Sequence, residues 1–586
     1  MMENLQDLRQ IWMKKWPEAL ALWSKFTRLR PPLWCHTQDD AEKEGLAGSF
    51  AMIRLQDHAI VISLPLIRKF HIEHFSLEIL AHEIGHHVFC PADLTDNARV
   101  IARMRWALPT KEYLAGFISN IYSDLLINDH LQRSAGLKMA DIYRILAGDS
   151  ADRMWTFYMR ICEILWSIEK EKLAKGGIKA QMEGDAQLGA RLIRSYAREW
   201  MEGAGRFAAL CLPYLLDDNA HGIQKILHAW RDTEQAGSGA VPDGLTEIEE
   251  GEREGAVHPS QDPDLAELDD PEEQGDVVEK SMPRQKKSPG GARGQHREPF
   301  QYGEILRSLG LNLNDHEIAV RYYKERAAPL LVPFPSRTVF ESTEPLPEGL
   351  EPWDIGSPLE SVDWMESVLL SPRVIPGMTT VQRVWGTMDG TQPEKLPLDL
   401  DLYVDCSGSM PNPQVTISYL ALAGAIIALS ALRAGARVQA TLWSGAHQFD
   451  TTGGFIRDAH KVLEILTGYL GDGTAFPIHM LRDTYSNRKQ HDRPAHILII
   501  SDSGVITMFD RDELNNSGWD IARIALSKAR GGGTMVLNLP TTWGGNKELA
   551  RAHKEGWQIS VVRTWEELEE FARQFSQLKY SEQEPA

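Results

Sequence analysis

The stretch LDLDLYVDCSGSM, residues 398–410, decides the fold of the C-terminal half of the chain. Its first eight residues have the length and pattern of a β-strand ending at Asp405, and the long apolar stretch 415–435 that follows has the length of a helix. Further strand-like runs come behind it, at residues 436–444, 496–502, 533–539 and 557–563. Apolar strands alternating with helices predict a mostly parallel sheet covered on both faces, a doubly wound α/β domain over residues 396–578.

The residues that follow this first strand have the chemistry of a cation site. Asp405, Ser407 and Ser409 offer one carboxylate and two hydroxyls from a single turn, and a hard cation takes oxygen ligands. The pattern DxSxS is the signature of von Willebrand factor A (VWA) domains, which residues 396–578 resemble. The resemblance implies a metal-ion-dependent adhesion site that Thr474 and Asp502 complete, with Mg²⁺ as the ion. It also implies that an acidic group of a protein partner adds the last ligand.

A second motif, HEIGHH, begins at His82 inside a predicted helix over residues 77–89. His82 and His86 are four residues apart, so they share one face of the helix and can bind one zinc ion. Glu83 follows His82 directly, where it can act as general base toward a water that zinc activates. The motif therefore predicts hydrolytic zinc chemistry.

The region around this motif resembles zincin-type metallopeptidases. In such enzymes peptide substrates commonly lie along an edge strand and bind it by β-addition. The strand-like stretch HAIVISLP, residues 58–65, is expected to be that edge strand. A protein or peptide is the substrate class that the resemblance implies.

A catalytic zinc site takes a third protein ligand, and the stretch NIYSDLLIND, residues 120–129, offers one. Asn120, Asp124 and Asn128 recur every four residues on one face of a predicted helix. Asp124 is the only anionic member of this row. We assign it as the ligand, with Asn120 and Asn128 as partners that orient the ligands. The alternatives are Asp129 and His130.

The composition changes between the two sites. From Glu234 to Glu279 the chain has 16 Asp or Glu against the single Arg253, a local balance of −15 within a net charge of −20. Without apolar periodicity, residues 235–298 are predicted to be a flexible linker, acidic at first and basic in its last part. Residues 1–234 then form a mainly helical domain with a small sheet, and residues 579–586 a short tail.

Residues 299–395 contain the stretch EPWDIGSPLESVDW. Its Trp353, Gly356, Asp363 and Trp364 resemble a segment that precedes VWA domains in bacterial proteins associated with MoxR-type AAA+ ATPases. Proteins with HExxH before a VWA domain also occur in that group. The resemblance implies a cytoplasmic bacterial protein that works with such an ATPase. An extra layer packed on the VWA sheet is an equally good interpretation of the segment.

The bulk composition limits the classes of function. A net charge of −20 opposes binding to nucleic acid, and no apolar run reaches the roughly 20 residues of a membrane span. Five scattered cysteines without CxxC spacing indicate neither a disulfide framework nor a thiolate zinc site, and they fit a reducing cytoplasm.

Two hypotheses remain for the function. The first is a zinc-dependent peptidase joined to a Mg²⁺-binding docking domain. The alternative is a non-catalytic VWA adaptor whose zinc domain is structural or inactive. Glu83 favours the enzyme, because a purely structural zinc site has no use for a general base.

Overall fold

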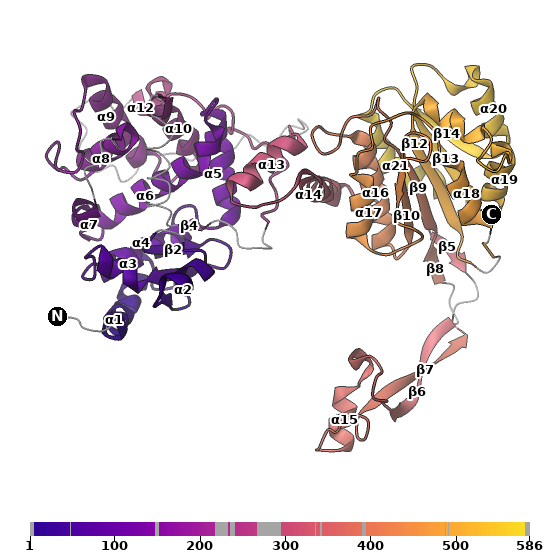
Figure 1. Ribbon diagram of the computed structural model, residues 1–586, viewed down its shortest axis with the longest axis horizontal. Coiled ribbons are helices and arrows are strands. Elements are labelled where there is room, and N and C mark those ends of the chain that lie inside the picture. Colours follow the sequence, from indigo (N-terminus) through magenta and orange to yellow (C-terminus); the bar gives the residue numbers. More distant parts are fainter. Residues whose placement is uncertain are drawn as a thin grey trace. The chain divides into compact units, whose positions relative to one another are not determined.

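The computed structural model describes residues 5–46, 49–146, 152–216, 233–234, 241–266, 295–334, 336–339, 343–389, 394–486, 488–489 and 492–580. The chain divides into two compact units, Met1–Glu325 and Arg326–Ala586, which we call unit 1 and unit 2 (Figure 1). Both units combine helices with β-sheet. Each described helix is too short or too polar to span a lipid bilayer.

Unit 1 is built around helix α6 (Ala115–Arg133), which is buried along most of its length. Because other helices surround its middle turns, α6 buries polar residues together with apolar ones. The helices that contact it are α4 (Ser76–Val88), α5 (Leu94–Trp106), α7 (Met139–Leu146), α8 (Arg153–Leu165) and α10 (Trp200–Leu216). The unit also contains α1 (Leu5–Trp23), α2 (Gln38–Lys43), α3 (Leu64–Lys69) and α9 (Ala180–Ser195). The prediction of a mainly helical N-terminal region with a small sheet agrees with this arrangement.

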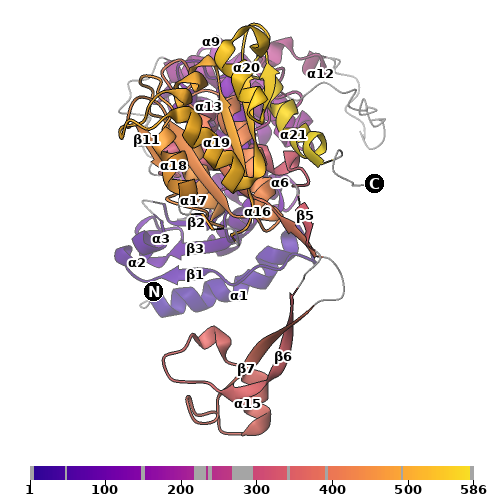
Figure 2. The ribbon, with the colours of Figure 1, turned by 90° about the vertical axis from the view of Figure 1, so that its right-hand side faces the viewer.

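Four short strands form the sheet of unit 1, in the order β1–β3–β2–β4. They are β1 (Leu33–Cys35), β2 (Ala51–Arg54), β3 (Ala59–Ser63) and β4 (Thr233–Glu234), and Figure 2 shows β1, β3 and β2 side by side. The stretch predicted as the edge strand forms β3 and the start of α3. That prediction is wrong, because β1 pairs with β3 in parallel and leaves it inside the sheet.

Strand β2, rather than β3, packs against α4, which carries the HEIGHH motif. On its outer side β2 pairs with β4, and this pairing joins Ile53 to Thr233 and Arg54 to Glu234. Phe50 directly precedes β2, and the pairing with β4 involves the opposite end of the strand. Within the described residues, β2 is the strand of this sheet that packs most closely on the helix of the motif.

The acidic segment is not a flexible tether over residues 241–266, so the predicted linker is wrong there. These residues include η2 (Pro259–Gln261) and α12 (Pro263–Ala266), and their key carboxylates are buried. Asp262 accepts hydrogen bonds from Tyr196 at 2.6 Å and from Arg206 at 2.5 Å. Glu252 accepts one from the Trp106 indole at 2.9 Å. The acidic side chains find their basic and polar partners on helices distant in the sequence, which a count of local charge misses. Residues 235–240 and 267–294 of the predicted linker lie outside the described residues.

The predicted boundaries around residues 299–395 also shift. Helix α13 (Pro299–Ser308) packs on α5 and belongs to unit 1, as does most of α14 (Asp315–Ala327). Beyond it, the Val332 amide donates to the Ser430 hydroxyl at 3.0 Å in unit 2. Strand β5 (Ser336–Val339) pairs with β8 (Glu394–Pro397). The segment is therefore divided between the two units instead of forming one layer on the second.

Residues 343–389, which we call the arm, fold on themselves. Strands β6 (Thr343–Pro352) and β7 (Val381–Asp389) form an antiparallel hairpin, and the short helix α15 (Trp364–Leu370) packs on β7. Half of the exposed large apolar side chains in the described residues lie in this arm. Among them are Ile355, Trp364, Met365, Leu369 and Met378, each more than half exposed.

Unit 2 contains a six-stranded sheet in the order β11–β10–β9–β12–β13–β14. All neighbours are parallel except β11 and β10. The strands are β9 (Asp399–Asp405), β10 (Val438–Trp443), β11 (Phe449–Thr451), β12 (Ala495–Ser501), β13 (Arg530–Asn538) and β14 (Trp557–Val562). The prediction of a doubly wound, mostly parallel sheet is confirmed. The antiparallel edge strand β11 was missed, because three half-polar residues carry no strand pattern.

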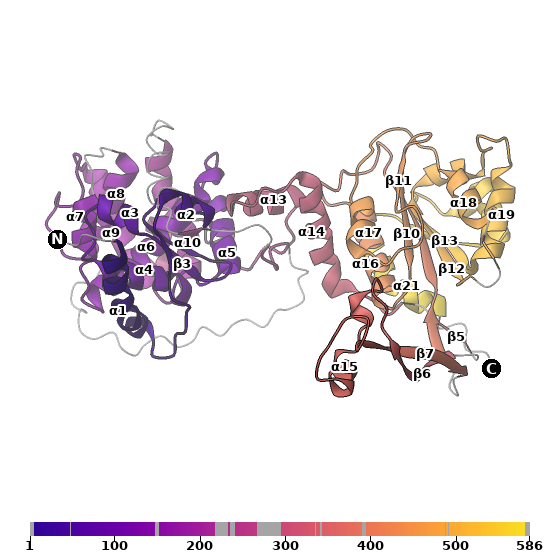
Figure 3. The same cartoon turned by 60° about the horizontal axis from the view of Figure 1, so that its bottom comes forward.

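Helices cover both faces of this sheet. Figure 3 shows α16 (Tyr419–Arg433) and α17 (Ala459–Leu466) on one face, and α18 (Ile478–Ser486) and α19 (Gly518–Ala529) on the other. Helix α21 (Glu567–Tyr580) packs on α16, and α20 (Lys547–Lys554) shares the apolar core of α18 and α19. Strands β9, β10 and β12 are buried at every residue. Covering on both faces explains their nearly continuous apolar sequences. The predicted tail begins one residue before the end of α21, and residues 581–586 are outside the described part of the chain.

Candidate metal centre

Helix α4 presents the two histidines of the HEIGHH motif on successive turns. It begins at Ser76, with Phe75 at the N-cap position. The Nε2 atoms of His82 and His86 are 3.2 Å apart, and both side chains are buried. The spacing of four residues thus turns both imidazoles toward one point, as the sequence predicts.

Gly85 lets α4 lie unusually close to its neighbours. A Cβ atom at this position would be 2.6 Å from Trp23 Cζ2 and 2.7 Å from Ile127 Cγ2. The Trp23 indole also donates to the Ala81 carbonyl at 2.7 Å, which holds α1 against the same helix. Glycine inside a helix normally costs stability, and here its lack of a side chain permits the close contact. That contact brings α6 within reach of the histidines.

Asp124 on α6 is the carboxylate that meets them. Its Oδ1 atom lies 3.4 Å from His86 Nε2 and 3.7 Å from His82 Nε2. The three ligand atoms all lie within 4.8 Å of one another, and all three residues are buried. Two imidazole nitrogens and one carboxylate oxygen at this separation can bind a single metal ion. The structure thus brings together the three residues that the sequence assigned as ligands.

The two alternatives for the third ligand are engaged elsewhere. Asp129 forms an ion pair with Arg133 at 2.5 Å. The ring of His130 stacks on Trp23, with ring centroids 4.9 Å apart. His87, the remaining histidine of the motif, lies against the His58 ring at 4.0 Å. In the described structure, these three side chains therefore have contacts outside the cluster.

The outer partners of the cluster orient its members. His82 Nδ1 is 2.7 Å from Asn128 Oδ1, and His86 Nδ1 is 3.2 Å from the Cys90 carbonyl. Because both partners are acceptors, each Nδ1 donates, and each Nε2 keeps its lone pair for a metal. Asn120 Nδ2 donates to Asp124 Oδ2 at 3.2 Å. The orienting positions predicted for Asn120 and Asn128 agree with these contacts.

No sequence pattern indicated the next members of this network. Asn128 Nδ2 donates to the Tyr143 hydroxyl at 2.8 Å, and that hydroxyl is 2.9 Å from the hydroxyl of Tyr158. Both tyrosines are buried, and burial raises the pKa of Tyr158 well above its ordinary value. Two buried phenols therefore support the amide that holds His82.

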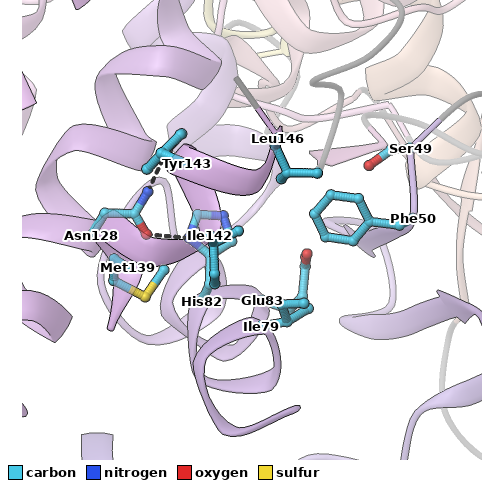
Figure 4. Close-up of a pocket in the computed structure, with 10 residues that line it drawn as sticks. All are labelled: Ser49, Phe50, Ile79, His82, Glu83, Asn128, Met139, Ile142, Tyr143 and Leu146. Carbon is cyan, nitrogen blue, oxygen red and sulfur yellow. Dashed lines mark hydrogen bonds between the residues drawn. The ribbon is translucent and has the colours of Figure 1, made fainter. Parts of the chain in front are cut away.

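Glu83 lies beside the cluster, in a pocket that Figure 4 shows together with His82. Its side chain is only 1% exposed. The pocket is lined by Ser49, Phe50, Ile79, His82, Glu83, Asn128, Met139, Ile142, Tyr143 and Leu146. The Glu83 carboxylate and the His82 imidazole therefore line the same small space.

The donor set fits a transition metal better than Mg²⁺. Neutral imidazole with one carboxylate suits Zn²⁺, whereas Mg²⁺ prefers oxygen ligands only. Cys90 does not offer a competing thiolate, because burial raises the pKa of its thiol far above the ordinary value and leaves it protonated. Its sulfur lies 3.4 Å from the Ser123 hydroxyl.

The predicted cation site of unit 2 lies at the C-terminal ends of two adjacent strands. Asp405 ends β9, and Asp502 directly follows β12. Chain order reverses between these strands, the place where ligands bind in open α/β sheets. Asp405 Oδ1 accepts from the Ser407 amide at 2.9 Å, and the Ser407 and Ser409 hydroxyls are 3.4 Å apart.

A neighbouring loop brings the fifth predicted residue to this site. The Gly408 amide donates to the Asp472 carbonyl at 2.7 Å, which joins that loop to the turn after β9. A Cβ on Gly504 would lie 2.4 Å from Thr474 Cγ2 and 3.0 Å from Asp502 Oδ1. The Thr474 side chain therefore lies beside Asp502. The sequence did not indicate Ser501, whose hydroxyl donates to Asp405 Oδ2 at 2.5 Å.

The electrostatics of this site favour a bound cation. Burial raises the pKa of the Asp405 carboxyl, and the negative charge of Asp502 adds to the rise. Hydrogen bonds from Ser501 and Ser407 act in the opposite direction. A cation beside the two carboxylates would offset the repulsion that raises the pKa of Asp405.

Comparisons with known proteins leave the identity of the chain to its own residues. No protein-family model, no curated protein and no solved structure matches it.

Proposed function

We propose that unit 1 is a zinc-dependent peptidase of the zincin type, with His82, His86 and Asp124 as metal ligands and Glu83 as general base. The observation that carries the proposal is the convergence of these three ligand atoms in a buried cluster, with the Glu83 carboxylate in the adjoining pocket. A structural zinc site gains nothing from a buried carboxylate beside it that is not a ligand.

The chain's own residues divide the work of hydrolysis. A zinc ion held by the three ligands would supply Lewis acidity, which acidifies water and polarises a carbonyl. Glu83 takes one proton from the attacking water as its oxygen bonds to the carbonyl carbon. Glu83 then gives that proton to the departing amine as the carbon–nitrogen bond breaks, so that water is added across the bond. Asn128 and the Cys90 carbonyl hold the two imidazoles in the tautomer that this requires.

Substitution of the base separates this function from its alternative. We expect Glu83→Gln to keep zinc, measured by atomic absorption, and to lose cleavage of an unfolded protein such as casein. Glu78→Gln is the matched control, since it makes the same change in the first turn of the same helix. Undiminished cleavage by Glu83→Gln would exclude the mechanism. Zinc retention with no cleavage by the wild-type protein would favour the adaptor with a structural metal.

For unit 2 we propose a VWA domain that binds Mg²⁺ through Asp405, Ser407, Ser409, Thr474 and Asp502. The supporting observation is the meeting of these residues at the point where strand order reverses. In a VWA domain the exposed side of the ion accepts an acidic group from a partner. A MoxR-type AAA+ ATPase is the partner that the resemblance favours.

Asp405 is the residue on which the second site depends. Asp405→Ala should abolish Mg²⁺ binding measured by titration calorimetry, and with it the Mg²⁺-dependent retention of a purified MoxR-type ATPase. Asp520→Ala is the control, because Asp520 is an exposed aspartate of the same unit, paired with Arg523. Zinc content should not change in either variant, because the zinc ligands belong to the other unit. Mg²⁺ binding by Asp405→Ala as strong as that of the control would refute the assignment.

A further inference from the structure

The pocket beside Glu83 has an apolar wall that the proposed chemistry does not use. Met139, Ile142 and Leu146 follow one another along one face of α7, and all three line the pocket. Ile79 lies one turn before Glu83 on α4. Phe50, directly before β2, completes this wall (Figure 4).

The polar groups of the lining are engaged within the protein. The Ser49 hydroxyl donates to the Ala51 carbonyl at 2.9 Å, and the Asn128 amide contacts His82 and Tyr143. Among the lining residues only His82 and Glu83 bear or readily gain a charge at neutral pH, and both belong to the proposed chemistry. An anionic side chain entering here would lose its water without gaining a counter-charge, and a cationic one would find only Glu83, which the proposed chemistry uses. An apolar side chain would gain free energy from burial.

We propose that this pocket is the subsite that selects the substrate: it takes an apolar side chain, such as that of Leu, Ile or Met, next to the scissile bond. The inference rests on the proposed peptidase function for the reaction itself. The selectivity comes from the apolar residues of α7, and binding measurements can test it without any cleavage.

A pair of metal-binding probes tests the subsite by affinity alone. The hydroxamates of N-acetyl-leucine and N-acetyl-aspartate carry the same zinc-binding group, so a difference between them reports the side chain. We expect the leucine compound to bind the zinc-loaded full chain at least roughly 10-fold more tightly, measured by titration calorimetry. This is the effect of burying one aliphatic side chain.

Two substitutions on α7 locate the selectivity. Ile142→Asp places a carboxylate in the wall and should remove the preference for leucine. Ile145→Asp makes the same change on the same helix at an exposed side chain outside the lining, and it should keep the preference. Ile142→Ala, a milder change at a buried position, should weaken binding of the leucine compound several-fold and keep the fold, checked by circular dichroism.

The outcomes separate the subsite from the reaction. Equal affinity of the two hydroxamates for the wild-type protein would overturn the subsite, and so would failure of both to bind. Loss of the preference in Ile145→Asp to the same extent as in Ile142→Asp would also overturn it. A clear preference for leucine in a protein that cleaves no peptide would contradict the peptidase and leave the apolar selectivity standing.

Discussion

Asn128 connects the candidate metal centre to a pair of buried phenols. Its carbonyl oxygen faces His82 Nδ1, and its amide nitrogen donates to the Tyr143 hydroxyl. An amide held at both ends cannot rotate without losing one contact, so Tyr143 helps to set the orientation of the imidazole. Outer partners of this kind strongly influence metal affinity in other proteins.

We therefore expect Tyr143→Phe to weaken zinc binding by about 10-fold, the lower end of the usual effect of losing an outer partner. The dissociation constant is measured by competition with a chelator at fixed pH. Tyr113→Phe serves as the control, because that tyrosine is largely exposed. Unchanged affinity in Tyr143→Phe would mean that Asn128 keeps its orientation without the phenol.

Asp401 makes the stability of unit 2 depend on pH. It is fully buried in β9, with the Tyr403 hydroxyl 3.3 Å from its Oδ2, and burial raises its pKa to about 7. In the unfolded chain the pKa of an aspartate is about 3.9. Between about pH 3.9 and about pH 7, the folded state therefore holds a proton that the unfolded state has lost. Stability from this group is therefore greatest at low pH and falls as pH rises through about 7.

Asp401→Asn removes that ionisation and should stabilise unit 2 at pH 8 by about 1–4 kcal/mol. At pH 5, only about one unit above the pKa of the unfolded aspartate, the same substitution should have roughly a third of that effect. Calorimetric melting of the full chain at both pH values measures the difference, with Asp520→Asn as an exposed control. An equal change at pH 5 and pH 8 would contradict the role of ionisation.

At the scale of single residues, the sequence predicted the members of the cluster that share a helical period. His82 and His86 are four apart on one helix, and Asp124 belongs to a polar row with the same period on another. Tyr143 and Tyr158 carry no such mark, since they lie 15 residues apart on α7 and α8 and meet only through packing. Ser501 was missed for the same reason, because it acts on Asp405 across two strands.

Among the elements, the contact between α4 and α6 is the one on which the candidate metal centre depends. The space that Gly85 leaves is occupied by Trp23 from α1 and Ile127 from α6. A side chain there would push α6 away and carry Asp124 with it. The distance between two helices is thus set by one missing methyl group.

Gly85→Ala should destabilise unit 1 by about 1–3 kcal/mol and weaken zinc binding, because the added methyl overlaps two side chains. Denaturant unfolding gives the first quantity and chelator competition the second. Gly177→Ala is the matched control, since its added methyl would meet nothing within 4 Å. The intrinsic helix propensity of alanine, taken alone, predicts that Gly85→Ala stabilises unit 1. Stabilisation would therefore show that the neighbouring side chains move aside at little cost.

For strands that are buried on both faces, the sequence predicted nearly the full extent of the strand. Strand β9 was expected over 398–405 and covers Asp399–Asp405, and β12 was expected over 496–502 and covers Ala495–Ser501. Prediction failed for the small sheet of unit 1. There, β3 was taken for an edge because the three residues of β1 have no pattern of their own. Pairing between short strands is decided by the tertiary fold, not by local sequence.

At the scale of the whole chain, the acidic segment defines where unit 1 ends. Glu249 pairs with Arg103 at 2.8 Å, and the Thr246 amide donates to Glu325 at 2.9 Å, far along the chain. Composition alone predicted a tether here, because it counts the charges of a segment without their partners. The compact unit instead continues to Glu325.

A fragment of residues 1–325 should therefore fold and melt cooperatively, whereas one of residues 1–234 should be much less stable. The shorter fragment leaves Arg206, Tyr196 and Trp106 without their carboxylate partners. Tyr196 is buried, and a buried polar group left unsatisfied costs about 1–3 kcal/mol, so we expect the melting temperature of the shorter fragment to be lower by several degrees. Equal melting temperatures by circular dichroism would mean that the acidic segment adds nothing to the fold.

The composition of the arm affects how molecules of the protein associate with one another in salt solutions. Its described residues combine exposed apolar side chains with an excess of acidic ones, among them Glu348, Glu351, Glu360 and Glu366. At low ionic strength the negative charges of the arm repel those of other molecules of the protein. In 0.1 M salt this repulsion extends only about 10 Å. Sulfate then strengthens apolar association. A Met365→Ser, Leu369→Ser double variant replaces two of the most exposed apolar side chains by polar ones. Light scattering should therefore show that the wild-type chain salts out at a lower ammonium sulfate concentration than this variant.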